Sequence, residues 1–575
     1  MDRRVIATVV VSIAILVGWY LVFPPAKPTP QPAAPTAPTA ATTPAPAATP
    51  ATPSATPTEG AAQPGAAAPA APTAAAQPDA PKPAEETTTL TVSGRVTITF
   101  TSWGATPKEV RLLDPQYQEY VLRNGKKELA PINLVRTSPS SLPLAISFPQ
   151  SDFAIPPDAA WTKVSSTDKD VVYAWEGGGV RVEKHYTIVP DTYLLNEKLV
   201  VSNTGDKAKK FFAQVSMFGH QDPKAEMGGF LGPRTTQTEG ACYANEKLKH
   251  EPFAALVKSP VADTGAVRWI GIDEKYFLSA VALAPPAAGA SRNCNVSAAA
   301  DGTITASVVD SAREVKPGEK AELELASFFG PKLLTALDDA KVGGVDAKLG
   351  AAINYGWTEI IARPMLAVLK AIHKVVANYG VAIILLTILI KLLTFWPTQK
   401  SMKSMREMAK LKPEIDKLKA RYGDDKQKFN MAYMQLLKEK GVNPLGGCLP
   451  MLIQMPIYIA LYSMLGNSVE LYRSSFVLWI QDLTAADPYF VMPVATGILM
   501  FVQQRMSPTP PDGQQKMLMY MMPVMFTAFT VFLPSGLTVY ILTNTILTMV
   551  QQLIINRSDS PSTKTAATGR KPAKA

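Results

Sequence analysis

The stretch GVAIILLTILIKLLTFWPTQK, residues 380–400, decides the fold of this chain. Its first part is long and apolar enough to cross a bilayer as a helix, because a bilayer core is about 30 Å thick and a helix rises about 1.5 Å per residue. Lys391 lies well inside the apolar run. An ammonium group at that depth costs at least about 2.5 kcal/mol. The sequence therefore predicts a membrane-spanning helix in which one charged residue needs water or a polar partner.

Three threonines share the predicted helix face of Lys391. Thr387 lies four residues before it, and Thr394 and Thr398 lie three and seven residues after it, so all of them fall on one side of a helix with about 3.6 residues per turn. This stripe predicts a face that meets water or polar groups rather than lipid, and no intramembrane Asp or Glu offers an obvious counter-charge. We therefore expect a hydrated groove. The alternative is that Lys391 snorkels to a membrane interface.

Four further apolar stretches follow residue 400, and each predicts another membrane-spanning helix. With the first, the expected spans are about 380–397, 449–465, 489–504, 517–533 and 537–555. Polar side chains recur one or two turns apart in the later spans. A lone threonine in a membrane helix usually bonds to its own backbone, so threonines alone are weak evidence for a groove. The stronger evidence is the charge of Lys391. We expect the groove to be lined further by Gln454, Tyr458, Thr496, Gln503, Tyr520, Thr527 and Thr545.

The beginning of the chain predicts an anchor and a tether. Residues 1–23 hold a basic flank and an apolar run, with Trp19 and Tyr20 where interfacial aromatic residues belong. A proline-rich stretch follows instead of a small-residue cleavage site, which favours a retained transmembrane anchor over a cleaved signal peptide. Residues 24–86 are almost entirely Pro, Ala, Thr and Gln. They cannot bury a core, so we expect a disordered linker.

Residues 87–340 predict an all-β domain of the sandwich type. Apolar and polar residues alternate in several runs, as in VRVEKHYTIV, and turn sequences such as NTGDK separate them. Cys242 and Cys294 both lie in this domain. The sequence does not fix their distance, so a disulfide and two free thiols are both compatible with it.

An amphipathic helix is expected over residues 354–378, between the β domain and the first core span. Its apolar residues recur at helical spacing, which favours a helix lying in the membrane interface. A surface helix packed on the β domain is the alternative.

The basic residues predict the topology. Residues 399–441, expected to form a helical hairpin, contain twelve Lys or Arg and six Asp or Glu residues, and the positive-inside rule places them in the cytoplasm. The basic tail, residues 557–575, then lies on the same side, so both termini are cytoplasmic and the β domain is outside. An apolar face on the hairpin would suit substrate reception, although a solvated charged hairpin explains the same pattern.

Known enzymatic motifs are missing from the sequence. It has no G-x-S-G, no H-E-x-x-H, and no G-x-x-x-x-G-K-[ST] phosphate loop. We therefore expect neither an enzyme nor a nucleotide-driven pump, and we expect no cofactor and no metal.

The stretch NPLGGCLPMLIQMPIYIALYSML, residues 443–465, closely resembles the third span of the YidC/Oxa/Alb family of membrane protein insertases. QQRMSP, QQKMLMYMMPVMFTAF and PSGLTVYILTN match further parts of the family in the same order and spacing. The resemblance covers roughly residues 354–556. The β domain resembles, more loosely, the periplasmic domain of the Gram-negative branch, through YFLSAV and VVSNTGDK.

The resemblance implies a multi-pass insertase and chaperone in the bacterial inner membrane, with a periplasmic β domain and six transmembrane helices, five of which form the core. Members of this family insert membrane proteins without nucleotide, alone or beside the Sec translocon, through a hydrophilic groove. The basic groove residue maps onto Lys391, a polar contact onto Thr387 and an aromatic substrate contact onto Tyr540. Implied partners are nascent membrane proteins, the Sec translocon, the ribosome, the signal recognition particle receptor and membrane lipids.

An ion- or proton-coupled solute transporter is the alternative function, because it too would place a charge among polar stripes. Against it, the sequence shows no inverted repeat and no pair of Gly/Pro-broken spans.

Overall fold

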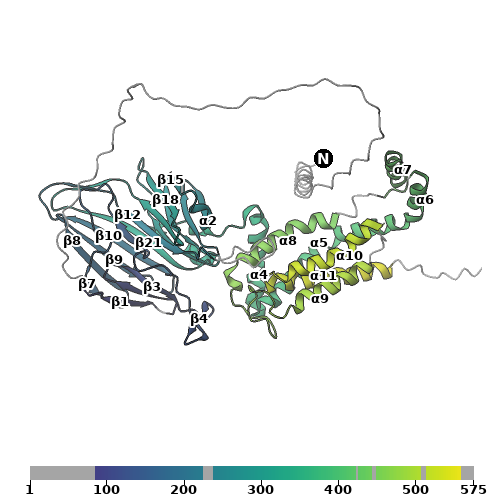
Figure 1. Cartoon of the computed structure of the whole chain (residues 1–575), viewed down its shortest axis with the longest axis horizontal. Helices are drawn as coiled ribbons and strands as arrows, with labels where there is room; N and C mark the ends of the chain where they lie inside the picture. Colours follow the sequence, from purple (N-terminus) through teal and green to yellow (C-terminus); the bar gives the residue numbers. More distant parts are fainter. Residues whose placement is uncertain are drawn as a thin grey trace, which may run out of the picture. The chain divides into compact units, whose positions relative to one another are not determined.

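The computed structural model describes residues 84–92, 94–224, 237–422, 425–442, 449–506 and 513–558 (Figure 1). The chain divides into two units, residues 1–82 and 83–575, and the described residues belong to the second unit. The predicted anchor, nearly all of the predicted linker, and the tail beyond residue 558 lie outside the described residues.

A nine-stranded antiparallel sheet forms the larger layer of the β-rich part (Figure 1). Its strand order is β14-β13-β16-β17-β21-β10-β9-β8-β7. β9 shows why the sequence forms strands: VRVEKHYTI buries nearly every second residue. The strands are β7 (Thr162–Ser166), β8 (Asp170–Gly177), β9 (Val180–Ile188), β10 (Leu194–Asn203), β13 (Glu239–Ala244), β14 (Lys247–Pro252), β16 (Val267–Asp273), β17 (Phe277–Leu283) and β21 (Lys320–Pro331).

A five-stranded sheet packs against the larger one. Its strands, in spatial order, are β15 (Val261–Gly265), β18 (Arg292–Ala298), β19 (Thr303–Val309), β12 (Gln214–His220) and β6 (Ala145–Ser147). The two sheets meet closely at Gly240 of β13, where a Cβ atom would overlap with Val296 of β18. The β-rich fold confirms the predicted class of this domain.

Smaller elements complete the β-rich part. A three-stranded sheet contains β1 (Thr87–Val92), β2 (Val96–Thr101) and β3 (Thr106–Leu112). Among the described strands, β4 (Gln118–Arg123) pairs only with β5 (Lys126–Pro131). The remaining elements are β11 (Lys209–Phe211), β20 (Arg313–Val315), β22 (Lys341–Val342), β23 (Val345–Asp346), α2 (Phe253–Leu256) and α3 (Leu334–Asp338).

A disulfide joins the two large sheets. Cys242 on β13 is bonded to Cys294 on β18, with their Cα atoms 6.6 Å apart. Of the two alternatives left open by the sequence, the structure shows the disulfide.

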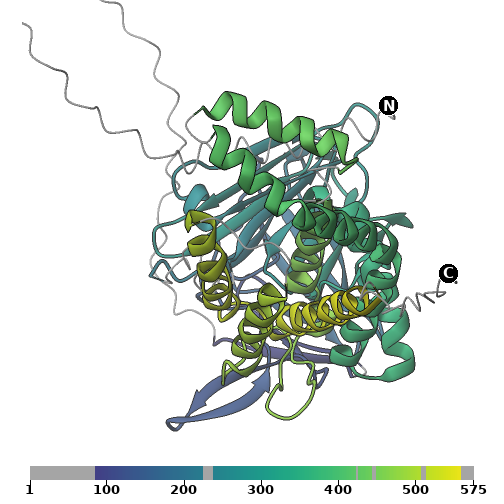
Figure 2. The ribbon, with the colours of Figure 1, turned by 90° about the vertical axis from the view of Figure 1, so that its right-hand side faces the viewer.

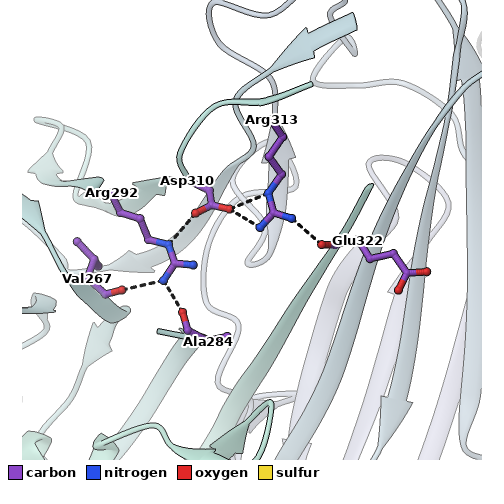
Figure 3. A network of polar contacts seen from close by, with 6 residues as sticks. All are labelled: Val267, Ala284, Arg292, Asp310, Arg313 and Glu322. Atoms are coloured by element: carbon purple, nitrogen blue, oxygen red, sulfur yellow. Dashed lines mark hydrogen bonds and ion pairs between the residues drawn. The ribbon is translucent and has the colours of Figure 1, made fainter. Parts of the chain in front are cut away.

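An ion network in the β-rich part joins the buried Arg292 and Asp310 to the half-buried Arg313 (Figure 3). The Arg292 guanidinium donates to Asp310 Oδ1 at 2.7 Å and to two backbone carbonyls, those of Val267 and Ala284. Arg313 donates to the other carboxylate oxygen at 2.9 Å. Burial alone would raise the pKa of Asp310, but the two guanidinium groups hold it below its ordinary value. The carboxylate is therefore ionised and fully bonded.

The second part of the chain is helical, because long apolar runs replace the period-two pattern. Its α-helices are α4 (Glu359–Val376), α5 (Tyr379–Lys410), α6 (Lys412–Tyr422), α7 (Lys426–Glu439), α8 (Leu449–Asn467), α9 (Val491–Arg505), α10 (Gly513–Thr530) and α11 (Ser535–Ser558). The described connections also contain the short 3-10 helices η1 (Leu349–Ala352), η2 (Gly356–Thr358) and η4 (Val469–Leu471).

Among the described residues, two helices are long and apolar enough to cross a membrane, over residues 379–410 and 535–555. The other predicted spans form helices near the expected positions, but their crossing of the membrane stays a prediction. α5 also differs from expectation, because it continues unbroken from the predicted span into the predicted cytoplasmic hairpin. The residues after Pro397 are mostly good helix formers, so the helix ends only at Lys410.

The segment between α8 and α9, residues 468–490, packs on the N-terminal ends of both long helices. The Asn378 side chain, which also caps α5, donates to the Phe476 carbonyl at 3.0 Å. At the start of α11, the Ser535 and Gly536 amides donate to the Ala485 and Leu483 carbonyls at 2.7 and 2.8 Å. This 468–490 segment therefore satisfies backbone groups that the start of α11 cannot bond internally.

Four titratable groups form a polar cluster in the β-rich part. His250 Nδ1 on β14 lies 2.8 Å from Glu239 Oε2 on β13, and the Lys332 ammonium donates to Asp273 Oδ1 at 2.7 Å. The hydrogen bond to Glu239 raises the pKa of His250, against the opposing effect of burial.

We predict that the disulfide stabilises the β-rich domain by about 4 kcal/mol, because it closes a loop of 52 residues in the unfolded chain. Replacing Cys242 and Cys294 together by Ala should lower the free energy of unfolding by an amount of that order, measured by denaturant titration of the detergent-solubilised chain. Reductant should destabilise the unmodified chain in the same way. Cys448→Ala, outside the described residues, is the control; equal stability of the two variants would contradict the prediction.

We predict that the contact of Glu239 with His250 stabilises the domain mainly in acid. Because folding raises the pKa of His250, this stabilisation is fully present below the unfolded value of 6.5 and is lost as pH rises through the folded value. The Tm difference between the unmodified chain and Glu239→Gln should therefore be larger at about pH 5.5 than at about pH 8. Glu251→Gln, next to His250 on β14, is the matched control. A larger difference at the higher pH would refute the assignment.

Candidate functional site

Lys391 lies on α5 and reaches across to α11. Its ammonium group, half buried, donates a hydrogen bond to Thr548 Oγ1 at 2.8 Å. The Thr548 hydroxyl donates its own proton to the Asn544 carbonyl at 2.6 Å, so its lone pairs face the ammonium group. Among the described residues, no carboxylate forms an ion pair with Lys391. The cation is therefore held by a neutral oxygen, which leaves its charge uncompensated.

α11 presents a polar face toward its neighbours α5 and α8. Tyr540, Asn544, Thr548 and Gln551 are spaced by four, four and three residues, so they lie on one side of the helix. Gln551 Nε2 donates to Thr398 Oγ1 on α5 at 3.2 Å. The polar face thus continues along α5 beyond Lys391.

Two polar residues of α8 meet the same face of α11. Gln454 Nε2 donates to the Tyr540 hydroxyl at 2.9 Å, and Asn544 Nδ2 donates to the Tyr458 hydroxyl at 2.8 Å. The rings of Tyr458 and Tyr540 pack edge to face, with centroids 5.4 Å apart. The two hydrogen bonds and the ring pair fix the relative rotation of α8 and α11. We call the set of Lys391, Thr398, Gln454, Tyr458, Tyr540, Asn544, Thr548 and Gln551 the polar seam.

The threonines of α5 use their hydroxyls mostly within their own helix. Thr387, Thr394 and Thr398 each donate to the carbonyl four residues earlier, at 2.6 to 2.9 Å. All three are buried. Of these three threonines, only Thr398 has a described hydrogen bond with another helix, and the groove-lining role of the stripe stays a prediction.

The remaining predicted groove residues have no described contact with Lys391. Thr496, Thr527 and Thr545 donate to carbonyls of their own helices. Thr527 of α10 also packs tightly on α9, where a Cβ at Gly497 would overlap with its hydroxyl. The ring of Tyr520 packs against that of Phe501 in a tilted arrangement, with centroids 5.9 Å apart, and Gln503 is half buried. Their role in a groove stays a prediction.

Sequence reasoning missed Asn544, Thr548 and Gln551. In the last span it expected Thr545 to line the groove, but Thr545 lies on a neighbouring side of α11. The spacing of four, four and three from Tyr540 to Gln551 would have marked the face that meets Lys391.

Outside the helices, one group of described residues could hold a metal ion: Glu239, His250 and Asp273, whose ligand atoms lie within 4.8 Å of one another. A cavity of about 220 Å³ adjoins them. However, the Lys332 ammonium already bonds Asp273, and His250 already bonds Glu239, so the cluster is satisfied without an ion.

Two family models match the chain. The model described as "60Kd inner membrane protein" matches residues 371–562, and that of the "YidC periplasmic domain" matches residues 93–368. A relative in Anaeromyxobacter dehalogenans, named membrane protein insertase YidC, is 38% identical over 580 residues, covering 98% of this chain and 99% of the relative. A protein of the same name in Geobacter sulfurreducens is 36% identical and covers 80% of this chain and 85% of the relative.

A solved structure, described as an active YidC insertase with the first transmembrane domain resolved, matches 81% of this chain and 94% of its own, at 17% identity and a TM-score of 0.35. The relatives are named for insertion, which is not an enzymatic activity. The two matching models and the relatives of nearly full length show that this chain belongs to the YidC family of inner-membrane protein insertases.

Proposed function

We propose that this insertase receives the short extracytoplasmic segment of an incoming membrane protein at the polar seam, with Lys391 as the group that attracts it. The observation that carries the proposal is the hydrogen bond from Lys391 to Thr548, made without a carboxylate partner among the described residues. A charge held only by a hydroxyl keeps most of its field, and that field is strong where water is scarce. Acidic residues of a passing segment would neutralise it.

Lys391 can bind a carboxylate without first breaking its own contact. An ammonium group has three N–H donors, and Thr548 takes one of them. The free donors can bond an Asp or Glu of the substrate in a charge-assisted contact. The substrate then leaves sideways as its apolar helix partitions into lipid, which supplies the driving free energy. No covalent step and no nucleotide are required, so insertion can proceed alone or beside the Sec translocon.

In the proposed topology the N-terminal ends of α5 and α11 face the periplasm, and both chain termini are cytoplasmic. Six crossings follow if the predicted anchor and α8, α9 and α10 span the membrane together with α5 and α11. α4 would then lie in the outer interface. Its Ala362 and Leu369 are fully buried, whereas Ile360 and Val375 are exposed, which is the two-sided pattern of an interfacial helix.

The α6–α7 hairpin is proposed to meet substrates and partners in the cytoplasm. Leu411, Leu437 and Val442 form a small buried core there, while Met431 and Met434 remain exposed. Exposed methionines are flexible and polarisable, so they can adapt to varied apolar segments. The basic residues around them would suit the ribosome, the signal recognition particle receptor or anionic lipid as partners.

We predict that Lys391→Ala abolishes insertion of substrates whose translocated segment is acidic, and that Lys391→Arg restores it, because the charge is what attracts the segment. The measurement is protease protection of the substrate in proteoliposomes without ATP. Lys400→Ala, which removes a lysine from the same helix beyond the apolar run, is the matched control. Failure of arginine to rescue, or equal loss for a substrate with a neutral segment, would sink the proposal. Solute uptake in place of insertion would favour a transporter.

We predict a different phenotype for Thr548→Val. Removing the hydroxyl that accepts from Lys391 should lower the stability of the helical part by roughly 2 kcal/mol, since a hydrogen bond to a charged group is lost. Insertion of acidic substrates should continue, because the ammonium group is still present. Thr548→Ser keeps the hydroxyl and is the control. Thermal unfolding in detergent measures the stability, and a variant as stable as the control would contradict the assigned contact.

A further inference from the structure

The β4–β5 hairpin stands apart from the sheets of the β-rich part. In the part of the chain that the structure describes, β4 and β5 pair only with each other, and they project as a two-stranded arm (Figure 2). Asn124 and Gly125 form the turn with positive φ values of 50° and 77°, as the tight turn of a two-residue hairpin requires. An isolated two-stranded hairpin is marginally stable in water, so an arm of this kind gains from a surface to lie on.

One face of this arm is apolar and exposed. Tyr120 lies opposite Leu129, and Leu122 lies opposite Lys127, so the four side chains share a face. Tyr120, Leu122 and Leu129 are 64%, 74% and 50% exposed, respectively. Three large apolar side chains gathered on a protruding arm are unusual for a surface that meets only water.

The base of the arm is bonded to the 468–490 segment. Gln116, just before β4, donates to the Glu470 and Tyr472 carbonyls at 3.1 and 2.8 Å. The Tyr472 hydroxyl donates back to the Gln118 carbonyl at 3.3 Å, and the Arg473 guanidinium lies 4.6 Å from the centre of the Tyr120 ring. The arm therefore leaves the protein beside the segment that packs on the ends of α5 and α11.

We propose that the β4–β5 hairpin binds the outer surface of the bilayer, with its apolar face among the lipid headgroups and its basic tip on phosphate groups of anionic phospholipids. The proposal rests on the topology given above, in which this end of α5 and α11 faces the periplasm. A tyrosine and two leucines suit the interface, where amphipathic rings and short apolar side chains gather. The tip, RNGKK at residues 123–127, carries three bases, so its charge complements an anionic surface.

The position of the arm favours lipid over a protein partner. Its apolar face begins at Tyr120, beside Arg473, in the same segment that packs on two membrane-competent helices. Lipid headgroups are therefore the nearest surface that this end of the molecule meets. An arm bound to a second copy of the chain or to another protein would not contact lipid. Quenching by labelled lipids distinguishes these cases.

The test uses the full chain in nanodiscs, with Cys448→Ser and a single environment-sensitive fluorophore at Leu122→Cys. Lipids carrying a nitroxide near the headgroup should quench this fluorophore at least about threefold more than one at Val164→Cys, because only the arm lies at the interface. Val164 is the matched control, since it is an exposed apolar residue of β7 in the same domain. A label at Leu129→Cys repeats the measurement should the first variant fold poorly.

Equal quenching at residues 122 and 164 would overturn the proposal. So would a label at residue 122 that is shielded from a soluble quencher but is not quenched by the lipid. Quenching that appears only when a second protein is added would also overturn it. Replacing Lys126 and Lys127 by Gln should lower the quenching in discs of phosphatidylglycerol and phosphatidylcholine, but not in phosphatidylcholine alone. No difference between the two lipids would remove the basic tip from the proposal. Lys391→Ala should leave the quenching unchanged, so failure of the arm and failure of the proposed insertion site are read separately.

Discussion

The hydrogen bond between Lys391 and Thr548 is the constraint on which the helical part depends. A cation among apolar helices needs an oxygen, and the structure supplies one from a residue 157 positions later in the chain. To bring that oxygen into place, α11 must turn its polar face toward α5. The same rotation lets Tyr540 and Asn544 meet α8. The contact of Lys391 with α11 and the contacts of α11 with α8 are therefore compatible with one rotation of α11.

The 468–490 segment packs on the N-terminal ends of α5 and α11. It bonds the starts of α5 and α11, and it also holds the base of the β4–β5 hairpin. Helix ends and strand ends share one difficulty, which is backbone groups without partners inside their own element. The 468–490 segment bonds groups of both kinds. It therefore connects the β-rich domain to the helices that carry the polar seam.

Local patterns in the sequence predicted most elements, but they did not predict which faces meet. Alternation in β9 and the apolar run before Lys391 were enough to assign strands and a helix. α11 carries two competing polar stripes, and only contact with α5 decides that the stripe through Thr548 faces Lys391. Likewise, 52 residues separate Cys242 from Cys294, and their approach to 6.6 Å depends on the stacking of two sheets. Long-range geometry of this kind has no signature in local spacing.

The disulfide between the sheets has a consequence for how the molecule matures. Cysteines pair durably in oxidising compartments and stay reduced in the cytosol. In the proposed topology, β13 and β18 can be joined only after both have crossed to the periplasm and have been brought together by folding. A newly made molecule therefore enters the membrane before its disulfide has formed. The β-rich domain then reaches its full stability only after its two thiols have been oxidised in the periplasm.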